Sequence, residues 1–478
     1  MEVEFPDNSS SSTTYPSSSD RINLLRNERN ENETDDDLIF GLEEEHYYNG
    51  KCATKCRPCC KYMPCYPSKG EVNIFIPTNL AIPVFYCMLG FLMKFPYVAL
   101  RYYLIHELQA KPSQQAIVYA VVMGMPWNFK MIYGFISDTC PIRGRKRKPY
   151  MFGGTILCSA SWLLFGLWTK PTFQTSPEMG FTCFLLFTAI FGMIFADVMA
   201  DALVVERMKG EKSHQKGGIQ STCWMLRFIG SFFGFVAGSL LTYDYSPNST
   251  AGFHPQTIFF LNGLVPLITM LPPLLWLHDP VVDGYQGKWH RSTELGDAIG
   301  GTMQGKTIQE EAKHKLDQVW ECVQMNHIWM PMSFIFVFGA TPNNSDVFAN
   351  FLLGPLCFSG KQVGSLAAFG MLASLGGTWI YKKWLRAVPF RRLFCITLVI
   401  AASFSATQLI LISRLNKALG IPDFLFALGD EVIVDTASFI VQMPTLVMCA
   451  SLCPKGVEST LYALMTGVWF LQMFVLDW

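Results

Sequence analysis

Long apolar segments, each followed by a shorter polar one, recur along the chain from residue 75 onward. A helix needs about 20 apolar residues to cross a bilayer, and eleven segments are long enough to do so. They cover residues 75–103, 115–137, 150–169, 179–203, 218–242, 256–277, 328–352, 363–384, 391–413, 422–450 and 456–478. The pattern therefore predicts an all-α, multi-pass integral membrane protein embedded in a lipid bilayer.

One connection is long, and it separates the first six predicted spans from the remaining five. From Thr307 its sequence carries apolar residues at helical spacing among polar ones, which predicts an amphipathic helix on the membrane surface. A plan of six plus six spans would lack its twelfth helix here. The predicted parts are a tail at 1–74, a six-helix bundle at 75–277, a central loop at 278–327 and a second bundle at 328–478.

Basic residues alternate from loop to loop, and they set the expected orientation because cytoplasmic loops are rich in Lys and Arg. The loop after the second span carries five of them between Arg143 and Lys148, and the loops after the fourth and eighth spans are also basic. The loop at 243–255 has none. We therefore expect the amino terminus and the central loop to be cytoplasmic, in the plasma membrane or an endomembrane.

Composition supports a membrane protein, with 50% hydrophobic and only 15% charged residues; a typical soluble domain is about a quarter charged. The 37 Lys and Arg residues balance 37 Asp and Glu residues, but residues 1–50 hold 13 acidic and 3 basic side chains. This Ser-, Asn- and acid-rich stretch is typical of a disordered tail. The composition excludes a coiled coil and argues against a nucleic-acid-binding protein.

Five cysteines lie just ahead of the first span, at Cys52, Cys56, Cys59, Cys60 and Cys65. Cysteines beside a membrane-spanning helix are candidates for S-palmitoylation, and free thiols or a thiolate zinc site are the alternatives. Zinc is the least favoured of the three because the spacing contains no second paired motif. We therefore assign neither a metal nor a cofactor to the chain.

The fifth and eleventh spans begin with related sequences. Gly218-Ile-Gln-Ser-Thr222 recurs 238 residues later as Gly456-Val-Glu-Ser-Thr460, and each copy follows an aspartate, Asp197 or Asp435, at the same distance. Two halves with the same order and orientation, joined by a long cytoplasmic loop, are the parallel-repeat plan of the major facilitator superfamily. The repeat therefore predicts that fold.

The loop after the second span supports this plan. Gly134-Phe-Ile-Ser-Asp138, followed by a basic run that includes Arg145, resembles the signature of the superfamily at this position. The resemblance implies that the aspartate meets a neighbouring helix end and that the basic residues gate the cytoplasmic side. Glu206, at the cytoplasmic end of the fourth span, is expected to form a salt bridge with these loops. The predicted gate thus comprises Gly134, Asp138, Arg145 and Glu206.

Several longer motifs resemble those of the folate–biopterin transporter family, over nearly all of residues 85–478. They include Pro126-Trp127-x-x-Lys130, Asp197-x-x-x-Asp201, Trp224-x-x-Arg227, Leu428-Gly429-Asp430 and the Cys453–Leu464 segment. The resemblance implies transport of folate or a related pteridine, and some members resemble carriers of S-adenosylmethionine. Asp435 has no counterpart in the family pattern.

Ionisable residues inside spans cost a few kcal/mol each on insertion scales and by default indicate a functional site. Asp197 and Asp201 lie four residues apart and so share one helix face. Two close carboxylates raise the pKa of one of them, which suits reversible proton binding. Ion pairing with Lys130 or Arg227, which would hold helices together, is the alternative. The ionisable residues well inside spans are Lys94, Lys130, Asp197, Asp201, Arg227, Asp430, Glu431 and Asp435.

The chemistry of a pteridine assigns expected roles to these side chains. Lys130 and Arg227 could bind the dicarboxylate tail of folate, and Asp430 or Asp197 the aminopyrimidine edge. Trp127 or Trp224 could stack on the flat ring, although aromatic residues in spans more often pack or face lipid. Gly230, Gly234 and Gly238 share one face at four-residue spacing, which favours close helix packing rather than a binding role.

An enzyme is the rival interpretation. Ala427-Leu-Gly-Asp430 resembles the Gly-x-Gly-Asp motif of intramembrane aspartyl peptidases, but the first glycine is alanine, and Tyr243-Asp244 falls in an outer loop. We therefore predict no enzymatic activity. The sequence contains no phosphate-binding loop of an ATPase, so we expect a gradient of protons to drive secondary transport. A non-transporting sensor on the same fold is the remaining alternative.

Overall fold

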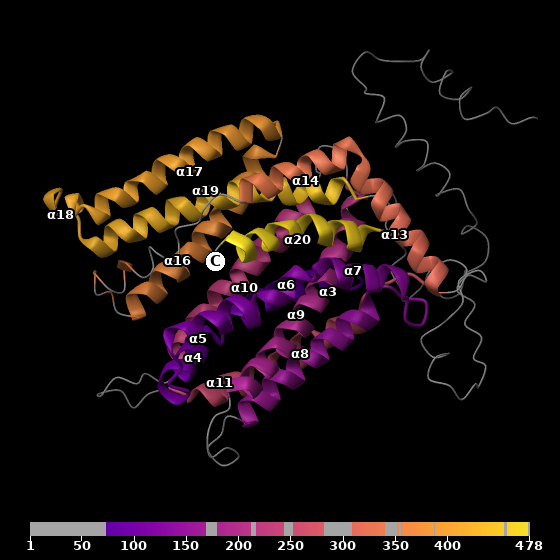
Figure 1. Ribbon diagram of the computed structural model, residues 1–478, viewed down its shortest axis with the longest axis horizontal. Helices are drawn as coiled ribbons and strands as arrows, with labels where there is room; N and C mark the ends of the chain where they lie inside the picture. The colour runs from indigo at the N-terminus through magenta and orange to yellow at the C-terminus, as the bar shows by residue number, and fades with distance from the viewer. Residues whose placement is uncertain are drawn as a thin grey trace, which may run out of the picture. The chain divides into compact units, whose positions relative to one another are not determined.

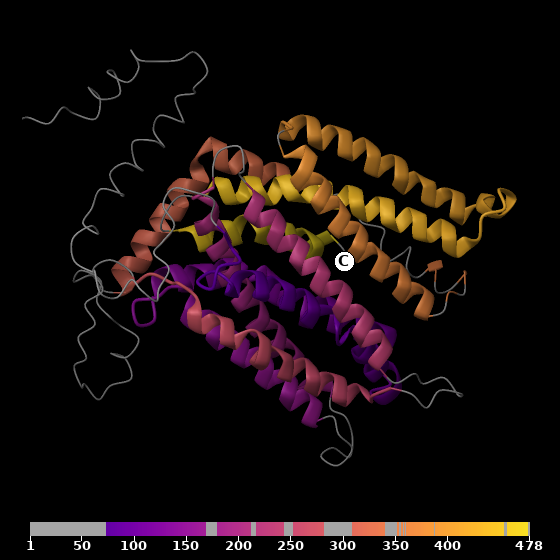
Figure 2. The same ribbon diagram turned by 180° about the vertical axis from the view of Figure 1, so that it is seen from behind.

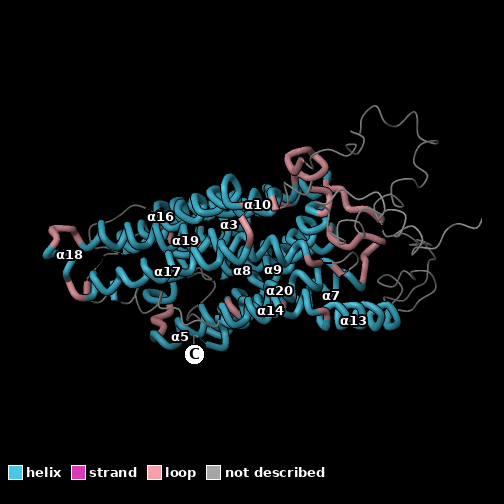
Figure 3. Tube along the Cα trace, turned by 90° about the horizontal axis from the view of Figure 1, so that it is seen from above, coloured by secondary structure: helices cyan, strands magenta, loops and turns pink. Residues whose placement is uncertain are grey.

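In the residues that it describes, the computed structural model consists of a series of helices (Figures 1 and 2). It describes residues 73–168, 179–211, 217–242, 252–281, 308–339, 351–352, 355–356, 358, 360–386, 388–453 and 457–476. Within these ranges the regular structure is helical, as Figure 3 also shows. The predicted tail up to residue 72 and its cysteine cluster lie outside the described residues.

The first six predicted spans coincide with helices of the first half. Breaks within the first, second and sixth spans divide each of them into shorter helices in sequence. The helices are α3 (Ala81–Lys94), α4 (Tyr97–Tyr102) and the π-helical η2 (Tyr103–Glu107); α5 (Pro112–Ile117), η3 (Val118–Met123), α6 (Met125–Asn128) and α7 (Lys130–Thr139); α8 (Lys148–Trp168); α9 (Met179–Met208); α10 (Gly218–Leu241); α11 (Pro255–Thr269) and α12 (Leu271–Trp276).

The helices after the central loop follow the same pattern. The amphipathic segment expected in that loop is a helix of its own, α13 (Ile308–Gln324). The remaining helices are α14 (Asn326–Gly339), α16 (Gly360–Ile380) with η5 (Tyr381–Leu385), α17 (Phe390–Ile412), α18 (Leu415–Ala418), α19 (Asp423–Ser451) and α20 (Glu458–Leu476). They overlap the five predicted spans of the second half and the short turn between two of them, and residues 340–350 of the first of these spans lie outside the described residues.

Six described segments are each long and apolar enough to cross a membrane by themselves. They are Ala81–Glu107, Lys148–Trp168, Met179–Met208, Gly218–Leu241, Pro255–Trp276 and Asp423–Ser451. Large apolar side chains lie on their outer surfaces, including Leu240 and Leu275, which are 77% and 68% exposed. Charged side chains such as Asp197 and Lys130 are buried instead. Apolar side chains outside and charged side chains inside are the reverse of the arrangement in a soluble protein, and they are expected of a protein surrounded by lipid.

Close helix packing in the first half depends on glycine. Gly230, Gly234 and Gly238 form a stripe along α10, and a Cβ atom at any of them would collide with the backbone of α3. The absence of side chains lets the two backbones approach closely, as small residues do between membrane helices. The stripe therefore has the packing role that its spacing predicts.

Contacts between the two halves are themselves paired. The second span of the first half (α7) packs against the eleventh (α20), and the fifth (α10) packs against the eighth (α16). In a repeat of six spans these two pairs correspond to each other, since the second span is equivalent to the eighth and the fifth to the eleventh. Figures 1 and 2 show α10 beside α16. The arrangement confirms the parallel-repeat fold that the sequence predicts.

Candidate functional site

A cluster of four buried charges lies among helices α3, α7, α9 and α10. We call Tyr86, Lys130, Asp197, Asp201 and Arg227 the central charge cluster. The two aspartates project from one face of α9, as their four-residue spacing requires. Lys130 is the first residue of α7, directly after the break at Phe129 that separates α7 from α6. The break places its side chain opposite α9.

Asp197 is the hub of the central charge cluster. Its Oδ2 atom accepts a hydrogen bond from Lys130 Nζ at 2.9 Å, and its Oδ1 atom accepts one from Arg227 Nη1 at 3.1 Å. Asp201 lies 3.5 Å from Lys130 Nζ and also accepts a hydrogen bond from the hydroxyl of Tyr86. All four charged side chains are buried, with Asp197 only 1% exposed. Two cations thus balance two carboxylates in a region shielded from water.

Two tryptophans border the cations. Lys130 Nζ lies 4.7 Å from the ring centre of Trp127, and the guanidinium of Arg227 lies 5.1 Å from that of Trp224. Cation–π contacts of this kind are stronger when the cation is desolvated. Among the described residues, the Trp224 Nε1 atom is buried without a hydrogen-bond partner. The cluster therefore combines two cations, two flat rings and an unused donor.

Other ionisable residues predicted as site candidates lie on the second half. Asp430 of α19 is buried and accepts hydrogen bonds from Thr407 Oγ1 at 2.8 Å and Gln408 Nε2 at 3.0 Å, both on α17. Asp435 and Glu431, four residues apart on α19, lie against Gly370 of α16. The contacts of Asp430 thus connect two helices of the second half rather than joining the central charge cluster.

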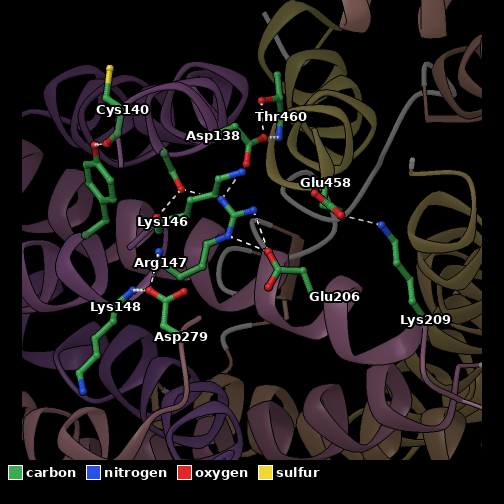
Figure 4. Close-up of polar contacts among 12 residues, drawn as sticks. Asp138, Cys140, Lys146, Arg147, Lys148, Glu206, Lys209, Asp279, Glu458 and Thr460 are labelled. Atoms are coloured by element: carbon green, nitrogen blue, oxygen red, sulfur yellow. Dashed lines mark hydrogen bonds and ion pairs between the residues drawn. The ribbon is translucent and has the colours of Figure 1, made fainter. Parts of the chain in front are cut away.

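A second polar network lies at the end of the bundle where α7 ends and α8 begins. We call Asp138, Arg147, Glu206 and Thr460 the gate cluster, shown in Figure 4. Arg147 Nη1 is 2.8 Å from Asp138 Oδ1, and its Nε and Nη2 atoms both donate to Glu206 Oε1, at 3.0 and 2.9 Å. Arg147 is 1% exposed. Burial by itself would lower the pKa of its guanidinium, but the nearby carboxylates of Asp138 and Glu206 outweigh burial and raise that pKa.

Asp138 joins the two halves of the chain. Its Oδ2 atom accepts hydrogen bonds from the backbone N–H of Thr460 at 2.9 Å and from the Thr460 hydroxyl at 2.7 Å. Thr460 lies in the first turn of α20, where backbone N–H groups have no partner within the helix and favour a negative charge. Nearby, Lys209 Nζ donates to Glu458 Oε1 at 2.7 Å. Both contacts connect the first half to α20.

Gly134 lets α7 and α20 pack closely at this junction, because it has no side chain. A Cβ atom there would lie 2.7 Å from the carbonyl oxygen of Ser459, closer than real Cβ contacts occur. Gly134 is one helical turn before Asp138, so the two residues face α20 together. The glycine permits the close approach that the aspartate then fixes with hydrogen bonds.

The repeat-related helix α10 has a corresponding junction. Lys382 of η5 donates to Thr222 Oγ1 at 2.6 Å, and Thr222 corresponds to Thr460 in the repeat. Glu211 accepts hydrogen bonds from the backbone N–H groups of Gly217 and Ile219, each at 2.7 Å. Burial raises the pKa of Glu211. A carboxylate thus accepts hydrogen bonds from backbone N–H groups at the start of each repeat-related helix, Glu211 at α10 and Asp138 at α20.

Most of the site residues expected from the sequence fall into these two clusters. Lys130, Asp197, Asp201, Arg227, Trp127 and Trp224 meet in or beside the central charge cluster, and Gly134, Asp138 and Glu206 meet at the gate. The guanidinium between Asp138 and Glu206 belongs to Arg147, however. Arg145, the expected gate cation, is half-buried and pairs through its backbone with Ile142.

Sequence reasoning did not single out Tyr86, Asp279 or the side chain of Thr460. Asp279 accepts hydrogen bonds from the backbone N–H groups of Arg147 and Lys148, at 3.0 and 2.8 Å, and so caps the start of α8. A phenol in an apolar run and an aspartate after a span carry no distinctive pattern. For Thr460 a signal did exist, because it ends the repeated segment that matches Gly218–Thr222.

Comparison with known proteins gives a consistent result. The model of the BT1 family matches residues 90–476. The chain is 32% identical to a folate-biopterin transporter of Synechocystis sp., covering 78% of this chain and 67% of that one. It is 26% identical to probable folate-biopterin transporter 4 of Arabidopsis thaliana, covering 78% and 82%. Among solved structures, a proton:xylose symporter of the major facilitator superfamily matches with a TM-score of 0.57 at 14% identity, covering 84% and 87%.

Proposed function

The chain belongs to the BT1 family, and on that premise we propose that it carries folate or a related pteridine across a membrane by alternating access. The observation that carries the proposal is the central charge cluster, in which Lys130 and Arg227 lie beside Trp127 and Trp224. A folate offers a flat aromatic ring and two carboxylates. Two buried cations next to aromatic faces match both features.

The central charge cluster also supports a way to bind and release such a substrate. Asp197 accepts a hydrogen bond from each of the two cations, so a substrate carboxylate must compete with it for Lys130 and Arg227. Arginine binds carboxylates through two parallel hydrogen bonds, which favours Arg227 as the principal clamp. The unused Nε1 donor of Trp224 is positioned to bind a polar edge of the ring.

Proton coupling is the second part of the proposal. Asp201 shares Lys130 with Asp197 and accepts a hydrogen bond from Tyr86. Protonation of either aspartate would remove one negative charge from a cluster that holds two cations, and so free a cation for the substrate. Proton binding and carboxylate binding would then support each other. The same logic makes the carrier a symporter.

We further infer that the gate cluster lies on the cytoplasmic side. The basic loops that carry Arg145 and Lys209 adjoin it, and such loops are retained in the cytoplasm. Contacts of Asp138 and Lys209 with α20 close this side, so access to the central charge cluster would be from the opposite side. Opening requires these contacts to separate. The amino terminus is then cytoplasmic as well.

Replacement of Arg227 by Lys tests the carboxylate clamp. Lysine keeps the charge but loses the planar pair of donors, so uptake of folate should fall far more than uptake of biopterin, which lacks the glutamate tail. We expect a difference of at least tenfold in membranes that contain equal amounts of protein. Arg207→Lys is the matched control, because Arg207 is a buried cation of α9 that bonds Asn79 and the His278 carbonyl instead.

Equal loss of folate and biopterin uptake would contradict the clamp and favour a purely structural ion pair with Asp197. In that case Arg227→Gln alone should impair folding, and the double variant Arg227→Gln with Asp197→Asn should restore it. The double variant should still not distinguish folate from biopterin. A screen of the parent protein with folate, biopterin and S-adenosylmethionine tests the substrate class itself. Uptake of S-adenosylmethionine alone would overturn the pteridine assignment.

A further inference from the structure

Helix α13 presents three different faces. Lys315, Val319 and Cys322 are buried, because α13 packs against α7 and α14 along this side. With 3.6 residues per turn, these three residues occupy a sector of about 60° around the helix axis. The inner face of α13 therefore rests on the helix that carries Gly134 and Asp138.

A second face of α13 is apolar and uncovered. Leu316 is 53% exposed and Trp320 is 63% exposed. They lie one turn apart, next to the inner face and about 100° beyond it. The remaining side is polar, with exposed Asp317 and Glu321. A helix that only covered the bundle would not need large apolar side chains at these two positions.

The direction of α13 differs from that of the spanning helices. In Figures 1 and 2 it runs across the end of the bundle, while α8, α17 and α19 run along it. It ends next to α14, whose exposed side chains include Trp329, Met330 and Val337. The uncovered apolar residues of α13 are therefore followed directly in the chain, and in an adjoining helix, by the exposed apolar residues of a predicted span.

We propose that α13 is an interfacial strap, with its inner face on the gate helix α7 and with Leu316 and Trp320 inserted into the bilayer surface. The leaflet concerned is the cytoplasmic one, a detail that rests on the proposed orientation. Tryptophan is enriched at membrane interfaces because its ring is apolar and its N–H is polar. Through these two contacts, the strap would hold α7 at a fixed depth relative to the membrane surface.

Apolar insertion, rather than attraction to lipid charge, holds the strap. Between Ile308 and Gln324 the helix carries four acidic residues and two lysines, so a negatively charged leaflet would repel it. Interfacial helices bind in proportion to the apolar area that they bury. A second copy of the chain is the rival occupant of this surface, and the experiment must separate it from lipid.

Site-specific photocrosslinking of the full chain in phosphatidylcholine nanodiscs makes that separation. p-Benzoylphenylalanine at position 320 should form lipid adducts at least fivefold more than at position 321 on the polar face. Position 337, on the outer face of α14, supplies the reference yield for full lipid contact. A yield at 320 equal to that at 321, or adducts between two copies of the chain, would overturn the strap.

Hydrogen exchange of the α13 amides gives a second, independent measurement. Leu316→Ser with Trp320→Ser should raise exchange of residues 312–324 about tenfold in nanodiscs, because the strap loses its lipid contact. Asp317→Ser with Glu321→Ser is the matched control and should leave exchange within twofold. No change in either variant would mean that the bundle alone holds α13. Neither readout requires transport, so failure here leaves the proposed substrate untouched.

Discussion

Asp138 provides the sharpest test of the gate. Its carboxylate binds Arg147 within the first half and Thr460 of α20 in the second half, and it is 1% exposed. The bond to Arg147 is available whether or not the halves separate. In the proposed alternating-access cycle, the two hydrogen bonds to Thr460 exist only while the two halves are in contact on this side. Replacement of Asp138 by Asn should therefore change the equilibrium between closed and open forms.

The size of the change follows from these two bonds. An asparagine oxygen can still accept from the Thr460 N–H and hydroxyl, but without the negative charge. Hydrogen bonds to charged groups contribute about 1.5–3 kcal/mol and neutral ones about 0.5–1.5 kcal/mol. Two weakened bonds amount to a loss of about 2 kcal/mol for the closed form. At about 1.4 kcal/mol per factor of ten, the open form should rise roughly 30-fold.

Labelling of a buried gate residue measures this shift. Ser459 is 1% exposed at the junction with Gly134, so Ser459→Cys, in a chain without native cysteines, reports opening through its reaction with a membrane-impermeant maleimide added from the cytoplasm. Asp279→Asn is the matched control, since Asp279 accepts hydrogen bonds from the backbone N–H groups of Arg147 and Lys148, both in its own half. Labelling should rise roughly 30-fold in Asp138→Asn and stay near the parent rate in Asp279→Asn.

Two results would refute the reasoning. The first is a labelling rate within twofold of the parent in Asp138→Asn, which would mean that the bonds to Thr460 do not hold the halves together. The second is an equal increase in both variants, which would indicate loosening of the first half rather than opening of the gate. Circular dichroism at equal protein level excludes simple unfolding as the source of either outcome.

Three further outcomes are expected. Gly134→Ala should force α7 away from α20 at a cost of about 1–3 kcal/mol and raise the labelling of Ser459→Cys. Gly153→Ala, where a Cβ meets open space, should not raise it, and equal effects of the two variants would contradict the close-approach role of Gly134. Asp197→Asn should abolish pH-driven uptake with the protein still in the membrane, and retained pH dependence in Asn variants of both aspartates of α9 would assign coupling elsewhere. Single cysteines at 145 and 212 should be labelled only from the cytoplasm and one at 248 only from outside, and labelling of all three from one side would overturn the orientation.

The fold could be predicted from the sequence because its signals are local. Apolar segments of bilayer length locate the spans, and a change to mixed polarity from residue 307 onward locates α13. The repeat of Gly218–Thr222 at residues 456–460 indicates two related halves. Each signal lies within a few consecutive residues, so no knowledge of distant contacts is needed. The shared helix face of Asp197 and Asp201 follows from helical geometry alone.

The identity of the cation between Asp138 and Glu206 depended on tertiary structure. Arg145 and Arg147 belong to the same basic run, and composition cannot distinguish them. The backbone turns at Arg143 and Gly144, which have φ angles of 53° and 75°, and Arg145 then pairs with Ile142 across the turn. The side chain that reaches Asp138 belongs to Arg147, two residues after Arg145.

The central charge cluster shows the same division between local and distant information. Sequence identified its four charges as costly inside spans, and left open whether they bind one another or a substrate. Only the packing of α3, α7, α9 and α10 brings Lys130 and Arg227 onto Asp197 and adds Tyr86. The hydrogen-bonded pairs of this cluster are separated by 30 to 115 residues in the chain. Helical periodicity determines which face a side chain occupies, whereas the close approach of α3 and α10 through the Gly230–Gly238 stripe determines what that face meets.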